Sequence, residues 1–480
     1  MRSWPVASVI ELSATEAAAR IRQGELQAED YAAALLDRES VARSLGALTW
    51  SEPQRVLADA RRIDALRAAG KPLGMLGGVP IIIKDNIDTL GFPTSAGTQI
   101  LKQYHPAADA PVVRALFDQG AILLAKANMH ELAGGGTSNN PVFGAVYNPY
   151  DRSRVAGGSS GGTAAALAAR FGAAGLGSDT AGSARIPASF CGICGFRPST
   201  AGYKKFPGGG IVPLSFTLDT AGPMARSVAD IALLNAAVTG APVPRAASLA
   251  GLRIGLPKQL YWLNLDAETQ RVARCAVDTL REAGVIFVDL DISSYIEGAQ
   301  QLFFTTLMSD LGKDLGEFLR IQNIPLSQAQ VVQQIASKDT YALFDSTSAF
   351  AAAAASPSEI KSLHATVANE YHEVLKRHGV EALCFPTEPI PAPVNRVGGD
   401  SPSDVVDVGG SSEPEPVSLV RNTSPVCALG APALTLPAGL TRSGLPVGLE
   451  LEGAIDADLR ILSIGIAVQS ALGSIPPPSC

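Results

Sequence analysis

The chain has few of the residues on which metal and redox chemistry depend. It contains five histidines and six cysteines in 480 residues, and the cysteines are scattered, unlike those of a secreted disulfide framework. Cys191 and Cys194 form a C-x-x-C pair, but a zinc site would need a second pair at ligand spacing. We interpret these two thiols as buried structural residues, with a redox pair as the alternative, and expect neither a metal nor a cofactor.

Positive charge and long apolar runs are also scarce. The 38 Lys and Arg residues are outnumbered by 45 Asp and Glu residues, giving a net charge of −7, whereas nucleic-acid binding needs a basic surface. No stretch approaches the roughly 20 apolar residues of a membrane-spanning helix, and residues 1–21 lack the apolar core of a signal peptide. The sequence therefore predicts a cytoplasmic protein without a nucleic-acid or membrane partner.

The chain instead alternates short apolar runs with helical patterns. Residues 14–69 are mostly helical in pattern, and Ser13 with Glu16 forms a capping box at their start. The apolar runs predict strands at residues 79–83, 121–129, 252–257, 284–291, 381–387, 433–439 and 447–453. Further helical patterns lie at residues 225–240, 266–283, 303–321, 361–378 and 456–472. This alternation predicts an α/β fold with a mostly parallel or mixed sheet covered by helices.

Two stretches depart from this alternation. Residues 348–359 are alanine-rich and of low complexity, whereas residues 398–418 are rich in Gly, Ser, Pro and acidic residues. The second stretch is a candidate mobile loop. It is either a surface linker or a lid over a site.

Three short segments carry candidate chemistry, and the first of them contains Lys84. This lysine ends the apolar run PIIIK and is followed by Asp85. A lysine that emerges from a buried strand is partly desolvated, which lowers its pKa and favours the neutral amine. A neutral amine can accept a proton, so Lys84 is a candidate base. The alternative is a surface lysine at a strand terminus.

The second segment is the glycine-rich turn GGSSGG at residues 157–162. It leads directly into the small-residue helix TAAALAAR, which a disordered linker would not do. Glycines let backbone groups approach closely and adopt positive φ, and a phosphate cradle is conceivable at such a junction. The pattern G-x-x-x-x-G-K-[ST] is absent, so nucleotide binding is discounted.

The third segment is the loop SDTAGS at residues 178–183. Its small side chains leave backbone N–H groups free to point at one spot, as an oxyanion hole requires. Arg185 follows at once, and we interpret it as a structural anchor paired with Asp179 rather than as a catalytic residue. Metal-assisted hydrolysis has no support from these motifs.

Taken together and in this order, the segments resemble the amidase signature family of serine hydrolases. The resemblance is carried by GVPIIIKDNID, KANMHELAGGGTSNNPVFGAVYNPYD, GGSSGGTAAALAA, GSDTAGSARIPASFCGICGFRPS and ALGAPALTLPAGLTRSGLPVGLELEG. It implies one large α/β domain over residues 1–480, with a twisted mixed sheet and helices on both faces. Within it we expect a helical segment at 1–69, a signature core at 70–240 and a variable substrate-side region at 300–420.

The resemblance also implies a Ser–Ser–Lys triad. Ser183 would be the nucleophile, Ser159 the proton shuttle and Lys84 the base. This agrees with the residue chemistry, because a serine needs an adjacent base to attack and a neutral lysine can act through an intervening hydroxyl. The expected reaction is amide hydrolysis through an acyl-enzyme.

The implied oxyanion hole consists of the backbone N–H groups of Thr180, Ala181, Gly182 and Ser183. Ala181 stands where the family usually has glycine. Alanine does not readily adopt positive φ, so we expect negative φ at this residue or a slightly reshaped loop. The set of donors is left open at this point.

The substrate is predicted to be a small-molecule aryl or arylacetyl amide. Residues 208–234 are similar to the branch of indoleacetamide and mandelamide hydrolases. Small residues in the substrate-side loop would leave room for a bulky acyl group, and apolar residues would supply walls. The expected substrate-binding residues are Gly134, Gly135, Phe206, Ile211 and Leu214. We interpret His130 as a structural or pocket-lining residue.

Other functions use the same motifs. An aryl acylamidase or a carbamate (urethane) hydrolase would need the same triad. The glutaminase-type subunit of a tRNA-dependent amidotransferase and a binding protein on an inactive scaffold are alternatives of other classes. Some members of the family dimerise through their N-terminal helices, so a homodimer through residues 14–69 is also an expectation.

Overall fold

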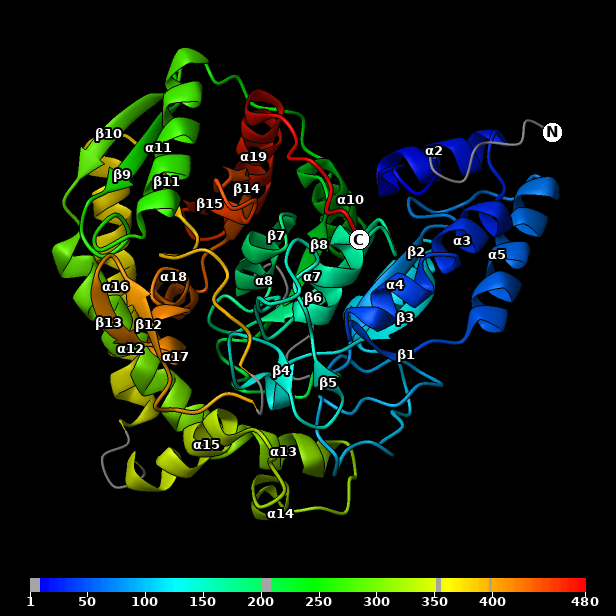
Figure 1. Ribbon diagram of the computed structural model, residues 1–480, viewed down its shortest axis with the longest axis horizontal. Helices are drawn as coiled ribbons and strands as arrows, with labels where there is room; N and C mark the ends of the chain where they lie inside the picture. The colour runs from blue at the N-terminus through cyan, green and yellow to red at the C-terminus, as the bar shows by residue number, and fades with distance from the viewer. Residues whose placement is uncertain (1–8, 201–208, 351–354, 397–398) are drawn as a thin grey trace.

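An eleven-stranded sheet forms the centre of the computed structural model, which describes residues 9–200, 209–350, 355–396 and 399–480 (Figure 1). Its strand order is β1-β3-β2-β6-β8-β7-β14-β15-β11-β9-β10. The strands are β1 (Leu48–Trp50), β2 (Pro80–Lys84), β3 (Ile122–Ala127), β6 (Ala174–Asp179), β7 (Cys194–Arg197), β8 (Thr220–Ala225), β9 (Arg253–Pro257), β10 (Ile286–Leu290), β11 (Ala382–Pro386), β14 (Ala433–Leu440) and β15 (Pro446–Gly453).

The sheet is mixed, as expected. Strands β3, β2 and β6 run parallel near one end, and β11, β9 and β10 run parallel at the other. Antiparallel pairs join these two sets through β8, β7, β14 and β15. Every run that was predicted to be a strand contains one, whereas strands β1, β6, β7 and β8 were not predicted.

Helices cover both faces of the sheet. Adjacent residues of a strand point to opposite faces, and on β14 these are Leu434 and Thr435. A Cβ added to Gly465 of α19 (Asp458–Leu472) would come within 2.2 Å of Leu434. On the other face, a Cβ added to Gly448 of β15 would touch both Thr435 and Ser189 of α8 (Arg185–Phe190). The helices α8 and α19 therefore sandwich this strand.

The helices are α2 (Ala14–Gln23), α3 (Ala28–Leu36), α4 (Glu39–Ser44), α5 (Pro53–Ala68), α6 (Pro111–Asp118), α7 (Gly161–Ala168), α8 (Arg185–Phe190), α10 (Val228–Thr239), α11 (Ala267–Glu282), α12 (Ser293–Leu311), α13 (Asp314–Ile321), α14 (Gln328–Val332), α15 (Lys338–Phe350), α16 (Pro357–His378), α17 (Glu415–Ser418), α18 (Ser424–Leu429) and α19 (Asp458–Leu472). Each expected helical segment contains a helix, but segment 303–321 is divided between α12 and α13, and α6, α8, α14, α15, α17 and α18 were not predicted. One large hydrophobic core draws on elements from α2 to α19, so the chain forms a single α/β domain.

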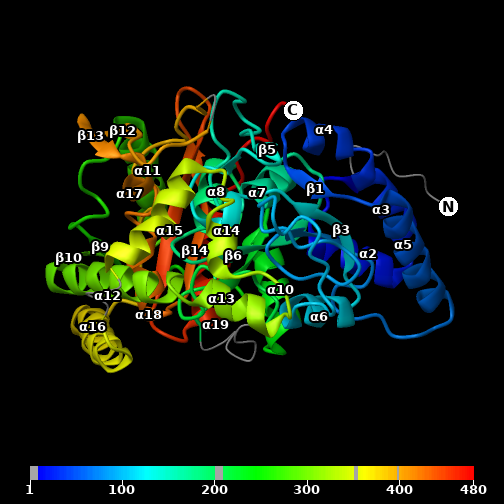
Figure 2. The same ribbon diagram turned by 90° about the horizontal axis from the view of Figure 1, so that it is seen from below.

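The two ends of the molecule differ in the elements that they carry. Helices α2 to α5 gather at one end, and β9, β10 and α16 lie at the other (Figures 1 and 2). The capping box of Ser13 and Glu16 is present at the start of α2, which confirms that prediction. Strand β1 interrupts the helical segment by pairing with β3.

The stretch predicted as a candidate mobile loop contains regular structure. It forms a hairpin of β12 (Val405–Val408) and β13 (Ser411–Pro414), followed by α17. Arg396 forms an ion pair with Glu415 at the start of that helix. Among the residues that the structure describes, no helix has the length and apolar character needed to cross a membrane.

Cys191 and Cys194 are both buried and form no disulfide. Burial raises the pKa of both thiols, so they are held as neutral groups in the interior. This agrees with their interpretation as buried structural thiols.

Candidate active site

Lys84 lies at the end of β2 and is completely buried. Its Nζ donates to Ser159 Oγ at 2.7 Å and to Ser178 Oγ at 2.8 Å. Burial lowers the pKa of Lys84 to about 7, although the nearby carboxylates of Asp219 and Asp179 act in the opposite direction. A substantial fraction of this amine is therefore neutral near pH 7, as a base must be.

The glycine-rich turn is packed against its neighbours and is not a linker. A Cβ added to Gly158 would lie 2.8 Å from the backbone nitrogen of Ser138, and one added to Gly162 would lie 2.3 Å from the carbonyl oxygen of Asn128. Only glycine permits such close approach of the backbone. The turn thus fixes Ser159, which is buried at the entrance to α7.

The serine loop that follows β6 is organised around one buried carboxylate. Asp179 accepts the N–H of Gly182 at 3.0 Å and that of Ala184 at 3.2 Å. Arg185 donates to the same carboxylate at 3.0 Å, which confirms the predicted pair. Burial raises the pKa of Asp179, but Arg185 and Arg197 outweigh it and hold the pKa well below its usual range. The carboxylate is therefore ionised and holds the loop in shape.

Ser183 sits in this loop close to the glycine-rich turn. Ser183 is buried, with 6% of the residue's surface exposed. The carbonyl oxygen of Ser183 accepts the N–H of Ser160 at 3.1 Å. The structure thus joins the segment of Ser183 to that of Ser159, and Ser159 in turn contacts Lys84.

The conformation at Ala181 agrees with the expectation from its side chain. Its φ is negative, whereas the φ of Gly182 is +117°. The carbonyl oxygen of Ala181 accepts the hydroxyl of Thr423 at 2.5 Å, and Thr180 donates its hydroxyl to Asp219 at 2.6 Å. The N–H of Gly182 is engaged by Asp179 within the loop, so it does not point freely at a substrate.

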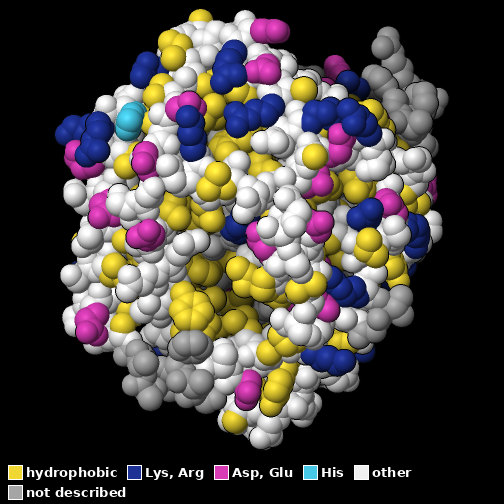
Figure 3. Space-filling view, turned by 60° about the vertical axis from the view of Figure 1, so that its left-hand side comes forward, with side chains coloured by type: hydrophobic (Ala, Val, Ile, Leu, Met, Phe, Trp, Pro, Cys, Tyr) yellow, Lys and Arg dark blue, Asp and Glu magenta, His cyan; other side chains and the backbone are white. Residues whose placement is uncertain are grey.

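A cavity of about 690 Å³ lies beside this loop. Ile211, Phe216 and Leu429 contribute apolar walls, and Asp219 connects the cavity to the hydroxyl of Thr180. The lining includes neither Ser159 nor Ser183. The cavity therefore adjoins the serine centre without enclosing it. On the face of the molecule that Figure 3 shows, hydrophobic side chains surround a hollow.

The other expected pocket residues have different environments. Ile211 lines the cavity, whereas Leu214 is buried and donates its N–H to Asp219 at 2.9 Å. Phe206 lies outside the described residues. A Cβ added to Gly135 would lie 2.3 Å from the His130 ring, and one added to Gly134 would lie 2.7 Å from Thr340. These two glycines therefore make room for neighbouring side chains.

Ser178 and Asp219 are site residues that the sequence reasoning missed. Ser178 contacts Lys84 directly and also accepts a hydrogen bond from Asn86 Nδ2 at 3.1 Å. Ser178 could have been found only from the pairing of β2 with β6. These strands are parallel neighbours in which Ile83 lies opposite Leu176. That register brings the end of β6 beside Lys84.

Comparison with known proteins identifies the class. A family model described as Amidase matches residues 30–462. The chain therefore belongs to the amidase signature family and is an amide hydrolase.

Three curated relatives span nearly all of the chain. Mandelamide hydrolase of Pseudomonas putida is 33% identical over 98% of this chain and 93% of its own length. Indoleacetamide hydrolase of Rhizobium radiobacter is 34% identical over 92% of both chains. A glutamyl-tRNA(Gln) amidotransferase subunit of Salinispora arenicola is 32% identical over 98% of this chain and 99% of its own.

A solved structure supports the same assignment. The native peptide amidase from Stenotrophomonas maltophilia superposes with a TM-score of 0.81 at 27% identity. The match covers 99% of each chain. The single α/β domain with its large mixed sheet is therefore the fold of this family.

Proposed function

We propose that the protein hydrolyses a carboxamide through an acyl-enzyme on Ser183, with Ser159 as the proton shuttle and Lys84 as the base. The observation that carries the proposal is the 2.7 Å hydrogen bond between Lys84 Nζ and Ser159 Oγ in a fully buried setting. A buried amine with a lowered pKa is suited to accept a proton through a hydroxyl.

The reaction begins when Ser183 Oγ attacks the amide carbonyl carbon. Its proton passes to Ser159 Oγ as the proton of Ser159 moves to Lys84 Nζ. The tetrahedral intermediate then collapses, the C–N bond breaks, and the leaving amine takes a proton from Ser159, which Lys84 reprotonates. Water cleaves the acyl-enzyme by the same relay and releases the carboxylate.

The oxyanion would be held by backbone donors of the serine loop. Because Asp179 accepts the N–H of Gly182, the proposal assigns this role to the N–H groups of Thr180, Ala181 and Ser183. Gly182 instead supports the loop from within. Donors fixed in this way stabilise developing charge without reorganisation.

We propose a primary arylacetamide as the substrate class. The named relatives act on mandelamide and indoleacetamide, and the cavity beside the serine loop has apolar walls from Ile211, Phe216 and Leu429. Its volume of about 690 Å³ is typical of small-molecule sites. An anilide or an aryl carbamate would use the same chemistry.

A panel of substrates tests this proposal. Amine or ammonia release would be measured for mandelamide, phenylacetamide, acetanilide and an aryl carbamate, with wild type and Ser183→Ala in parallel. We expect fastest turnover of a primary arylacetamide and none in the variant. A faster anilide or carbamate would change the substrate class. Activity that appeared only with a partner subunit would favour the amidotransferase alternative.

A further inference from the structure

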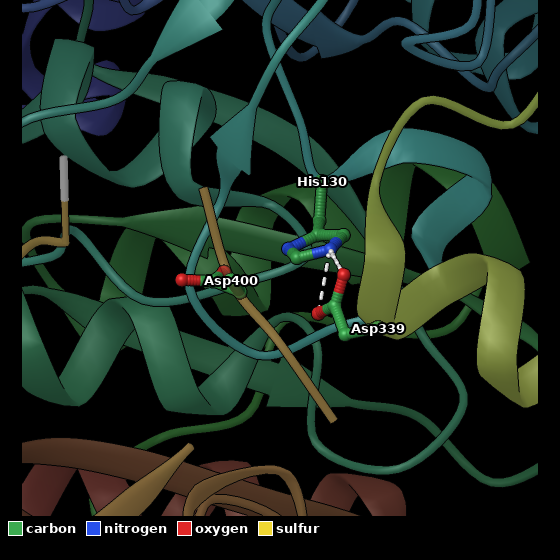
Figure 4. Close-up of side chains that lie close together, drawn as sticks. All are labelled: His130, Asp339 and Asp400. Carbon is green, nitrogen blue, oxygen red and sulfur yellow. Dashed lines mark hydrogen bonds and ion pairs between the residues drawn. The ribbon is translucent and has the colours of Figure 1, made fainter. Parts of the chain in front are cut away.

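His130 is a buried histidine that the proposed mechanism does not use. It lies between β3 and the glycine-rich turn, and its ring packs against Gly135. Figure 4 shows the ring between Asp339, at the start of α15, and Asp400. Its Nε2 lies 3.1 and 3.4 Å from the two carboxylate oxygens of Asp339.

The other ring nitrogen is an acceptor. The backbone N–H of Ser138 donates to His130 Nδ1 at 3.3 Å, and Thr137 Oγ1 lies 3.3 Å from the same nitrogen. In the neutral ring the hydrogen bond from Ser138 places the proton on Nε2, which faces Asp339. Asp400 accepts the hydroxyl of Thr137 and the side-chain amide of Asn139. The three side chains could share a metal ion, but their polar atoms are already paired with one another or with the loop.

Ser138 connects this histidine to Ser159. Its φ is +62°, in the left-handed region that a residue with a side chain occupies only when its surroundings hold it there. Ser138 Oγ donates to the carbonyl oxygen of Ser159 at 3.3 Å and accepts the N–H of Gly161 at 3.0 Å. The two flanks of the shuttle serine thus rest on Ser138.

The same cluster anchors the outer helix α15. The carboxylate of Glu131 accepts the N–H groups of Ala336 and Ser337 at 2.9 and 2.7 Å. Asp339, which orients the imidazole, is the second residue of that helix. Asp339, in the variable region, is therefore one hydrogen bond from His130, and the backbone N–H of His130 itself donates to the carbonyl oxygen of Ser159 at 3.1 Å.

We propose that His130 is a positioning residue for Ser159: Asp339 orients the imidazole, Nδ1 holds Ser138, and Ser138 holds the loop that aims the shuttle hydroxyl at Lys84. This inference rests on the proposed role of Ser159. The acceptor at Nδ1, rather than the bulk of the ring, is the feature that matters.

Two amide variants separate the acceptor at Nδ1 from the donor at Nε2. In His130→Asn the side-chain oxygen takes the place of Nδ1 and can still accept the N–H of Ser138, but the reach to Asp339 is lost. In His130→Gln the amide nitrogen takes the place of Nε2 and can still donate to Asp339, but the acceptor for Ser138 is lost. Steady-state ammonia release from phenylacetamide would be measured for both, with His372→Gln on the exposed side of α16 as a control.

We expect His130→Gln to lower kcat about 10- to 100-fold at unchanged KM, since small misplacement of a reacting group costs on this scale. His130→Asn should retain kcat within about threefold, and the control should match wild type. Ser138→Ala, which removes the side-chain link alone, should lower kcat as well. The double variant His130→Gln/Ser138→Ala should be little worse than His130→Gln, because both act through one path.

Wild-type kcat in His130→Gln, or equal losses in the Asn and Gln variants, would overturn the inference. If His130→Gln does not fold, an unchanged kcat in Ser138→Ala would overturn it instead. Ser159→Ala distinguishes this failure from that of the proposed function: full activity in Ser159→Ala would remove the shuttle itself, whereas an inactive Ser159→Ala with an active His130→Gln would reject only the positioning role.

Discussion

The serine centre and the outer helical region use charge in opposite ways. At the serine centre, Asp179 and Arg185 are fully buried and hold the loop of Ser183. In the outer region, ion pairs such as Arg320–Glu317 lie on the surface, with side-chain exposures of 71% and 44%. Water screens the second kind of pair, so it contributes little, whereas a buried charge that loses its partner is costly.

The two regions differ in how tightly the positions of their residues are fixed. Around Ser159 and Ser183, small residues let backbone segments touch, and buried hydrogen bonds fix their geometry. In the outer region, α14 and α16 begin with exposed capping boxes, and α13 buries one face through Leu315, Phe318 and Leu319. We therefore expect substitutions around the serine centre to change kcat or the free energy of unfolding strongly, and substitutions in the outer region to change them little.

The largest effect is expected from Lys84→Met. Removal of the base should lower kcat by about 10²- to 10⁴-fold, the general scale of acid–base catalysis. The matched control is Lys376→Met in α16, whose lysine is 69% exposed, and it should leave kcat unchanged. Comparable rates for wild type and Lys84→Met in an ammonia-release assay would contradict the proposed role.

A similarly large effect on stability is expected from Arg185→Ala. The change leaves Glu450 without its buried guanidinium partner and Asp179 with Arg197 alone, and it should lower the free energy of unfolding by about 3–5 kcal/mol. Arg320→Ala, in the outer region, should have no measurable effect. Urea unfolding followed by circular dichroism measures both variants, and equal midpoints would refute the contrast between the two regions.

The pH dependence of kcat/KM should follow the titration of Lys84. Lys84 must be neutral to accept a proton, and its pKa is lowered to about 7, so kcat/KM should rise with pH up to about 7 and then level off. Asp219 raises the pKa of Lys84. Asp219→Asn should therefore move the rise of kcat/KM to lower pH, whereas Glu373→Gln in α16 should leave it unchanged. A shift to higher pH in Asp219→Asn would show that another group titrates.

The smallest effect is expected at a helix cap of the outer region. Ser356 forms a capping box with Glu359 at the start of α16. Ser356→Ala should lower the free energy of unfolding by about 1 kcal/mol, with kcat unchanged. A loss of kcat without a loss of stability would mean that α16 acts on the chemistry directly.

Much of the serine centre could be predicted from the sequence because its signals are local. Lys84 ends an apolar run, Ser159 lies in a run of glycines, and Ser183 lies in a run of small residues. The structure brings Lys84 into contact with Ser159 and hydrogen-bonds the segment of Ser159 to that of Ser183. Their roles in catalysis stay a prediction.

The features that were missed depend on contacts between distant segments. Strand β7 has only four residues, and β8 is rich in Gly, Ala and Pro, so the apolar pattern of both is weak. The partnership of His130 with Asp339 joins residues that are 209 positions apart. The hairpin of β12 and β13 has a composition typical of loops, and its backbone pairing leaves little trace in the sequence.

The most direct test of the central claim is the site of covalent modification. The protein would be treated with an aryl fluorophosphonate, a serine-directed reagent, and the modified peptide located by mass spectrometry, with Ser183→Ala in parallel. We expect one adduct per chain on Ser183 and none in the variant. An adduct on Ser159 or Ser178, or equal labelling of the variant, would contradict Ser183 as the nucleophile.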